Sequence, residues 1–122
     1  MKGISNVGFT PRSIPIKYIH IDTENPRYRE RLILKGKRKW NEQELEKIIE
    51  EKDIESIIPS IRKAGVIDPI WVHEKKKNYF QIVEGSRRFV ALKFLNSRTD
   101  VKPPKGVSYD VVKQMYFQKI HL

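Results

Sequence analysis

The feature that most constrains this chain is the stretch Val83–Ala91, in which a strand pattern meets a helix pattern across a single glycine. Before it, residues 78–83 are rich in aromatic and β-branched side chains that alternate, which predicts a strand. After it, apolar residues recur at helical spacing, which predicts a helix. The chain is therefore expected to turn sharply at Gly85 and to begin a helix near Ser86.

The residues of this turn favour an anion site. A helix N-terminus leaves backbone N–H groups unpaired and carries partial positive charge, so it attracts anions. Arg87 and Arg88 follow the turn, and guanidinium groups hold phosphate oxygens through forked hydrogen bonds. The sequence predicts a phosphate site here. The alternative is a plain turn followed by two solvated arginines.

Composition sets the class of protein. The 122 residues are 39% hydrophobic and 33% charged, which is typical of one polar globular domain. No apolar run approaches the roughly 18 residues of a membrane helix, and no secretory signal opens the sequence, so we expect a cytoplasmic protein without a membrane partner. With no cysteine and three scattered histidines, disulfides and thiolate chemistry are excluded and no metal cluster is expected. Abundant Lys, Glu and Ile hint at a thermophilic source.

Charge is unevenly distributed along the chain. The net charge of +10 favours a polyanionic partner. Residues 27–39 carry seven cations against the one acid Glu30, whereas acids gather in residues 42–55. Such segregation suits a one-sided DNA footprint, although a solvated loop is the alternative. We expect contacts with DNA phosphates, without base reading, from Arg29, Arg31, Lys37, Arg38 and Lys39.

The pattern divides the chain into three parts. Residues 1–15 show no period and contain glycine and proline, so we expect a flexible arm. Residues 16–112 form the domain. Residues 113–122 show helical spacing, which predicts the start of a C-terminal helix that docks or leads into a further region.

The domain opens with a predicted strand at residues 16–21, followed by an Asn-Pro turn that would present Asn25 and Arg27 at the end of the strand. Ends of strands are where ligands gather in α/β folds. A plain turn with an exposed arginine is the alternative.

Two helices are expected next. Asn41, with Glu44 three residues on, predicts a capping box for a helix that ends near residue 52. A second pattern starts at Asp53 as its cap, and Pro59 within it has to kink or divide that helix. Gly65 is expected to end it.

The remaining elements complete the fold. Proline opens a strand near residues 69–73, a polar hairpin leads into the strand before Gly85, and a last strand is expected at 107–112. The sequence thus predicts an α/β (α+β) domain with a small mixed sheet flanked by helices.

Three segments, in this order, resemble the N-terminal domain of ParB, the chromosome and plasmid partition protein, within the ParB/sulfiredoxin superfamily. They are the turn Asn25-Pro26-Arg27, the segment SIRKAGVIDPIWV at residues 60–72, and the turn at residues 85–88 with Ala91. The resemblance runs from about residue 16 to residue 112. It implies that the last turn binds the phosphates of a nucleoside triphosphate, CTP in the partition proteins, and that Pro69 lies near the base.

We therefore expect Arg87 and Arg88 to clamp phosphates, Gly85 to let the backbone approach them, and Ser86 to donate a hydrogen bond. Asn25 and Arg27 are expected to close the site. Glu84 either holds Mg²⁺ with the phosphates or pairs with Arg27, and the pairing is the favoured reading. Dimerisation with a second copy of the chain is left open.

The sequence also departs from the family pattern. Ser86 stands where the partition proteins have glutamate, and the basic segment at residues 28–40 is longer than the usual connection. The downstream helix that completes the triphosphate and magnesium site, and the helix-turn-helix DNA reader, are not evident. Switching and site-specific DNA binding are therefore not implied.

Two alternatives remain at this level. One is a small NTPase or phosphotransferase like the serine-kinase branch of the superfamily, with Glu84 or Glu30 as the base. Ser86 and Arg87 stand where that branch has histidines, which argues against the same proton transfer. γ-Phosphate turnover above a Glu84→Gln control would distinguish it. The other alternative is a non-specific DNA-binding domain without a nucleotide, whose DNA affinity would be unchanged in an Arg87→Ala/Arg88→Ala variant.

Overall fold

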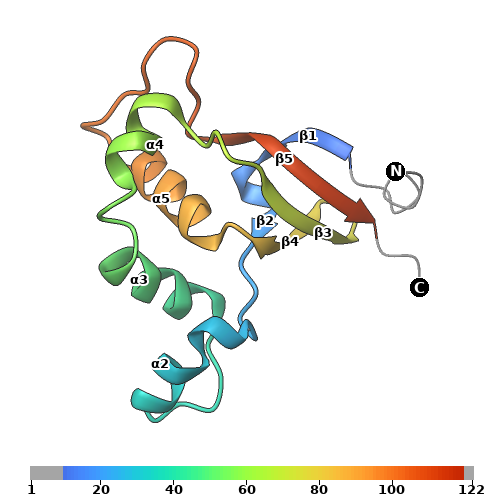
Figure 1. Ribbon diagram of the computed structural model, residues 1–122, viewed down its shortest axis with the longest axis vertical. Helices are drawn as coiled ribbons and strands as arrows, with labels where there is room; N and C mark the ends of the chain where they lie inside the picture. The colour runs from blue at the N-terminus through green and yellow to red at the C-terminus, as the bar shows by residue number, and fades with distance from the viewer. Residues whose placement is uncertain (1–9, 120–122) are drawn as a thin grey trace.

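The computed structural model describes residues 10–119, and in this part of the chain a five-stranded mixed sheet packs against helices (Figure 1). The α+β class predicted from the sequence is confirmed. The elements are β1 (Thr10–Pro15), η1 (Ile16–Tyr18), β2 (Ile19–His20), η2 (Pro26–Tyr28), α2 (Arg29–Leu34), α3 (Glu42–Lys52), α4 (Ile58–Ala64), β3 (Ile70–Lys76), β4 (Tyr79–Glu84), α5 (Ser86–Ser97) and β5 (Val111–Lys119).

The strand order is β1-β5-β3-β4-β2. β3 and β4 form the predicted antiparallel hairpin, β5 runs parallel to β3, and β2 runs parallel to β4. β1 and β2 occupy opposite edges although only the three residues of η1 separate them in sequence. The sheet therefore has to curl, and the Arg12 guanidinium of β1 lies 5.5 Å from the centroid of the Phe80 ring on β4.

α5 is the centre of the core. It lies with α3 and α4 on one side of the sheet and contacts both helices and β3 (Figure 1). Five of its apolar side chains are buried: Phe89, Val90, Ala91, Leu92 and Leu95. Burial contributes about 1.5–3 kcal/mol for each of the four larger side chains and less for Ala91. Because this helix is so firmly embedded, its N-terminal turn is held in a fixed position.

The two predicted helices after residue 40 are present, with one change. Asn41 and Glu44 form the expected capping box at the start of α3. Asp53 is the C-cap of α3 rather than the N-cap of the next helix, which begins only at Ile58. Pro59 divides the pattern and sits in the first turn of α4, where its missing N–H costs nothing. Gly65, at φ +73°, ends α4 as predicted.

Both ends of the domain differ from the prediction. The expected arm at residues 1–15 contains strand β1 from residue 10 onward, an edge strand in which Pro11 and Pro15 are tolerated. The helix expected at residues 113–122 is wrong, since the described residues of this range continue β5 to Lys119. Tertiary pairing with β1 and β3 overrides the helical spacing. Residues 1–9 and 120–122 lie outside the described part.

Two predicted strands begin later in the chain than expected. Only Ile19 and His20 of the strand expected at 16–21 pair with a neighbour, because residues 16–18 form the 3₁₀ turn that carries the chain between the sheet edges. The strand expected at 107–112 begins only at Val111.

Candidate functional site

Gly85 forms the turn between β4 and α5. Its backbone lies at φ +111°, ψ +21°, a region that favours glycine. A Cβ at this position would lie 2.8 Å from Nη2 of Arg88 and 2.9 Å from Cγ1 of the buried Ile70. The glycine is therefore required both for its backbone conformation and for the close approach of these two side chains.

The N-terminus of α5 has no compensating group of its own. No side chain caps the helix, and its first turn contains no acidic residue. The partial positive charge of the helix is thus left without an internal partner. An anion at this turn would meet backbone N–H donors and no carboxylate from the first turn of the helix.

Arg88 folds back over the glycine turn. Its Nη2 donates a hydrogen bond of 3.1 Å to the carbonyl oxygen of Pro69, and its Nη1 lies 3.7 Å from the carboxylate of Asp68. The Asp68 side chain is 82% exposed, so this ion pair is open to water and weak. Pro69, expected from the resemblance to lie near the nucleotide base, is thus in direct contact with Arg88.

Arg87 points to a different segment. Its Nε donates to the backbone carbonyl of Asp53 at 3.0 Å, and its Nη2 lies 3.4 Å from Oγ of Ser56 in the loop between α3 and α4. Beside it lies a hollow of about 570 Å³ lined by Lys52, Asp53, Glu55, Ser56, Pro59 and Arg87. The two arginines are therefore held by separate segments instead of closing together over one point.

These contacts leave donors free on both side chains. A guanidinium group carries five N–H donors, and the hydrogen bonds described above use two of them on Arg87 and one on Arg88. Backbone carbonyls position the two groups while further N–H donors remain for a ligand. The donor chemistry of the turn therefore fits a phosphate group.

Asp53 connects this turn with the basic segment. Its carboxylate accepts two hydrogen bonds from Arg31, at 2.6 and 2.7 Å, while its backbone carbonyl holds Arg87. The bond from Arg31, followed by the charges of Arg31, Arg87 and Arg27, lowers the pKa of Asp53 despite its burial. Three guanidinium groups thus act on one carboxylate, leaving an excess of positive charge.

Replacing Asp53 by asparagine is expected to destabilise the fold at neutral pH by about 1.5–3 kcal/mol, because the charged fork with Arg31 is lost. The folded-state pKa lies below the unfolded value, so the stabilisation is present above the unfolded pKa and is lost as pH falls through the folded pKa. Urea unfolding at a series of pH values measures this. The difference between wild type and D53N should shrink with acid, and a pH-independent difference would contradict it.

The predicted partners from the first turn lie at the same end of the sheet. Because β2 runs parallel to β4, the turn that follows β2 and the Gly85 turn that follows β4 lie at the same end of the sheet, beside the carboxyl ends of the two strands. Asn25 caps η2 by accepting from the backbone N–H of Arg27 and lines a hollow of about 430 Å³ beside residues 81–83 of β4. Arg27 is exposed and acts on Asp53 through its charge.

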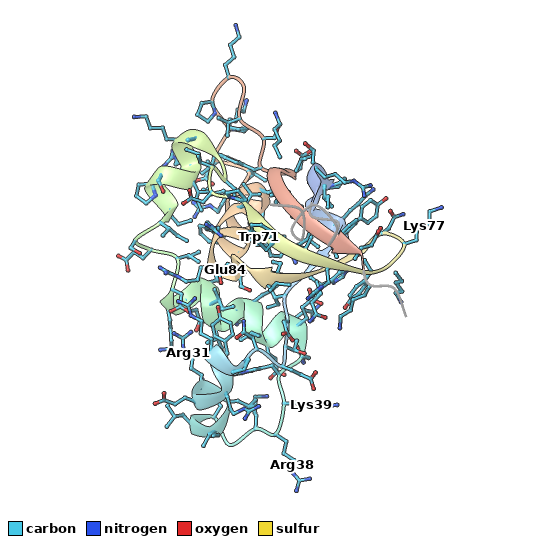
Figure 2. All side chains as sticks on the ribbon, turned by 45° about the vertical axis from the view of Figure 1, so that its right-hand side comes forward. Arg31, Arg38, Lys39, Trp71, Lys77 and Glu84 are labelled. Atoms are coloured by element: carbon cyan, nitrogen blue, oxygen red, sulfur yellow. The ribbon has the colours of Figure 1, made fainter. Side chains whose placement is uncertain are left out.

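Glu84 and Ser86 flank the glycine. Glu84 is exposed at the end of β4, opposite Trp71 of β3 (Figure 2). Within the described residues it forms no ion pair with Arg27, so the expected pairing is wrong. Ser86 is buried at the first position of α5. No group of three or more metal-binding side chains occurs in the described part of the chain.

The cations of the basic segment separate into two sets. Arg31 is occupied by Asp53, and Lys37 pairs with Glu44. By contrast, Arg29, Arg38 and Lys39 are exposed and line one hollow of about 160 Å³ with Thr23, Glu24, Asn25, Leu32 and Trp40. Arg38 and Lys39 point away from the body of the molecule, far from Lys77 on the β3–β4 hairpin (Figure 2).

Sequence reasoning missed the role of the α3–α4 loop. The sequence predicts only a helix cap at Asp53 and no role for Ser56, because no local pattern relates these residues to Arg87, which lies 34 and 31 positions away. The available signal was the single acid-rich stretch at 42–55 beside an arginine-rich segment, which indicates pairing between the two.

Comparison with known proteins shows the family of this chain. The profile of the ParB N-terminal domain matches residues 32–104, which is more than half of the chain. The chain belongs to the ParB N-terminal domain family. A search of curated proteins finds no significant match.

One solved structure shares the fold. It is a C-terminally truncated chromosome-partitioning protein ParB from Caulobacter crescentus, crystallised with CTP-gamma-S. The match has a TM-score of 0.50 and 22% sequence identity, and it covers 91% of this chain and 44% of that one. The chain thus spans less than half the length of that ParB structure. Among the described residues, no helix is both long and apolar enough to cross a membrane.

Proposed function

We propose that this chain is the nucleotide-binding module of a ParB-like DNA-partition protein and that it binds the phosphates of CTP at the N-terminus of α5. The observation that carries the proposal is the uncapped start of α5, where two arginines are positioned by the backbone carbonyls of Asp53 and Pro69. The CTP-gamma-S complex of the Caulobacter protein supports the choice of nucleotide.

The proposed roles follow the chemistry of each group. Arg87 and Arg88 donate to phosphate oxygens through their remaining N–H groups, and Gly85 allows the backbone amides to approach. Arg27 adds charge from the turn after β2, and Asn25 offers its amide N–H₂ group because its carbonyl is already used in capping. Ser86 donates a hydrogen bond. Any Mg²⁺ would bind with the triphosphate, with Glu84 as its proposed protein ligand.

Calorimetric titration with the four NTPs and ADP, with and without Mg²⁺, tests the proposal. We expect saturable binding of CTP that is tighter than that of ADP, since a triphosphate offers more charge to the turn than a diphosphate. The expected preference for CTP over the other three NTPs rests on the CTP-gamma-S complex of the Caulobacter protein. Absence of binding by every nucleotide would contradict it. Release of γ-phosphate, abolished by Glu84→Gln, would instead favour the phosphotransferase alternative.

We further propose that the same domain contacts DNA phosphates through Arg29, Arg38 and Lys39. The observation that favours this is the hollow of about 160 Å³ that these exposed cations share. The fork between Arg31 and Asp53 and the pairing of Lys37 with Glu44 give those two cations a structural role. We therefore propose that Arg31 and Lys37 mainly hold residues 29–39 in place and contribute less to DNA contact than the three exposed cations do.

A further inference from the structure

The end of α2 exposes two large aliphatic side chains at the far end of the molecule. Ile33 is 68% exposed and Leu34 is 78% exposed, whereas Leu32 packs against the core. α2 lies at one end of the longest axis, away from the sheet (Figure 1). Two adjacent exposed aliphatic side chains rimmed by polar residues form a small apolar patch at this projecting tip, the kind of feature that marks an interaction site when a partner fits it.

The tip is held in a defined shape. Lys35 and Gly36 close α2 by donating to the carbonyls of Arg31 and Ile33, and Gly36 takes φ +66°. At the base, Nε1 of the buried Trp40 donates to the carbonyl of Tyr28 at 3.3 Å. The Arg31–Asp53 fork ties α2 to the end of α3. The aliphatic pair is therefore presented by a braced element.

The charged residues around Ile33 and Leu34 favour a polyanion as the binding partner. In the described part of the chain, Lys35, Arg38, Lys39 and Arg29 are exposed and form no ion pair, and Glu30 is the one acid of residues 29–39. The 160 Å³ hollow gathers three of these cations. A cationic tip that also carries bare aliphatic side chains matches the way minor-groove proteins bind DNA, with basic residues on phosphates and an apolar wedge at a base step.

We propose that this tip, residues 29–39, is a minor-groove wedge in which Ile33 and Leu34 insert at a base step while Arg29, Arg38 and Lys39 hold the flanking phosphates. The inference rests on the proposed DNA contact and adds its mode. Affinity then depends on how easily two neighbouring base pairs of the DNA unstack, so flexible pyrimidine–purine steps are favoured over stiff A-tracts. The base edges are not read by hydrogen bonds.

The test uses the full chain and a duplex of about 20 base pairs with a central TA step and a neighbouring aminopurine that fluoresces on unstacking. We expect the wild type to raise the fluorescence and the Ile33→Ala/Leu34→Ala variant to lose most of the rise. That variant should keep its salt slope, because its phosphate contacts are intact. Ile67→Ala/Val83→Ala, which shortens two exposed aliphatic side chains elsewhere, should behave as wild type.

Neutralising Arg29, Arg38 and Lys39 together should lower the slope of log affinity against log salt by about 2–3. Lys75→Ala/Lys76→Ala/Lys77→Ala removes the same charge from the hairpin and should change the slope much less. DNA binding with no fluorescence rise, or a rise unaffected by I33A/L34A, would overturn the wedge and leave the pair as a protein-docking surface. Absence of any DNA binding would overturn the DNA contact itself.

Discussion

Replacing Arg87 and Arg88 together by alanine is expected to weaken CTP binding by at least about 100-fold. Charged hydrogen bonds each contribute about 1.5–3 kcal/mol, so the loss of two guanidinium donors removes about 3–6 kcal/mol of binding free energy. Hydrogen bonds to the backbone carbonyls of Asp53 and Pro69 already hold the two arginine side chains in place. Little conformational entropy is therefore lost when they bind the nucleotide. Calorimetric titration of the variant measures the change.

A matched control separates this site from general charge. Arg62→Ala/Arg98→Ala removes the same charge near the opposite end of α5, where Arg98 pairs with Asp100 and Arg62 of α4 acts on the same carboxylate through its charge. We expect the control to bind CTP within about two-fold of wild type, since exposed charges at that distance are screened. Equal weakening in both double variants would show that only net charge matters, and an unaffected R87A/R88A variant would place the phosphates elsewhere.

Substituting alanine at Gly85 is expected to destabilise the fold by about 3–5 kcal/mol, with a fall of about 10–20 °C in Tm. The new Cβ meets Cγ1 of Ile70 at 2.9 Å, and Ile70 is a fully buried residue of β3, so its side chain has little room to move. The backbone at φ +111° adds strain for any residue with a Cβ. Thermal unfolding followed by circular dichroism measures the change.

The same substitution at Gly106 separates the two causes. Gly106 also has positive φ, at +83°, but a Cβ there meets nothing within 4 Å. We expect a loss of about 1–2 kcal/mol, which is the backbone strain alone. A Gly85→Ala variant no less stable than Gly106→Ala would contradict the close packing at the turn. In G85A the Cβ also displaces Arg88, so nucleotide affinity should fall even in the folded fraction.

The parts of the fold that the sequence predicts correctly are those with local causes. The capping box of Asn41 and Glu44, the stop at Gly65 and the strand-to-helix turn at Gly85 each depend on residues within a few positions of one another. β1 and β5 do not. They are strands because they pair with each other across a hundred residues, and the spacing at 113–119 fits a helix equally well in isolation.

The candidate site shows the same division. The turn and its two arginines follow from the residues and from the family resemblance. That Arg87 reaches the α3–α4 loop while Arg88 reaches Pro69 depends on how three segments meet in space. Asp53 has two roles, since its carboxylate binds Arg31 and its backbone carbonyl binds Arg87. The spacing of residues in the sequence does not indicate this, and only the structure reveals it.

The most direct measurement is amide NMR of the full chain during titration with CTP, with cytidine as the comparison. A phosphate held at the start of α5 predicts that the largest shifts fall on the backbone N–H groups of residues 85–88 and on the Nε–H groups of Arg87 and Arg88. Cytidine, which lacks phosphates, should leave these signals in place. Shifts confined to other surfaces, or equal shifts with cytidine, would contradict the central claim that this turn binds the phosphates of a nucleotide.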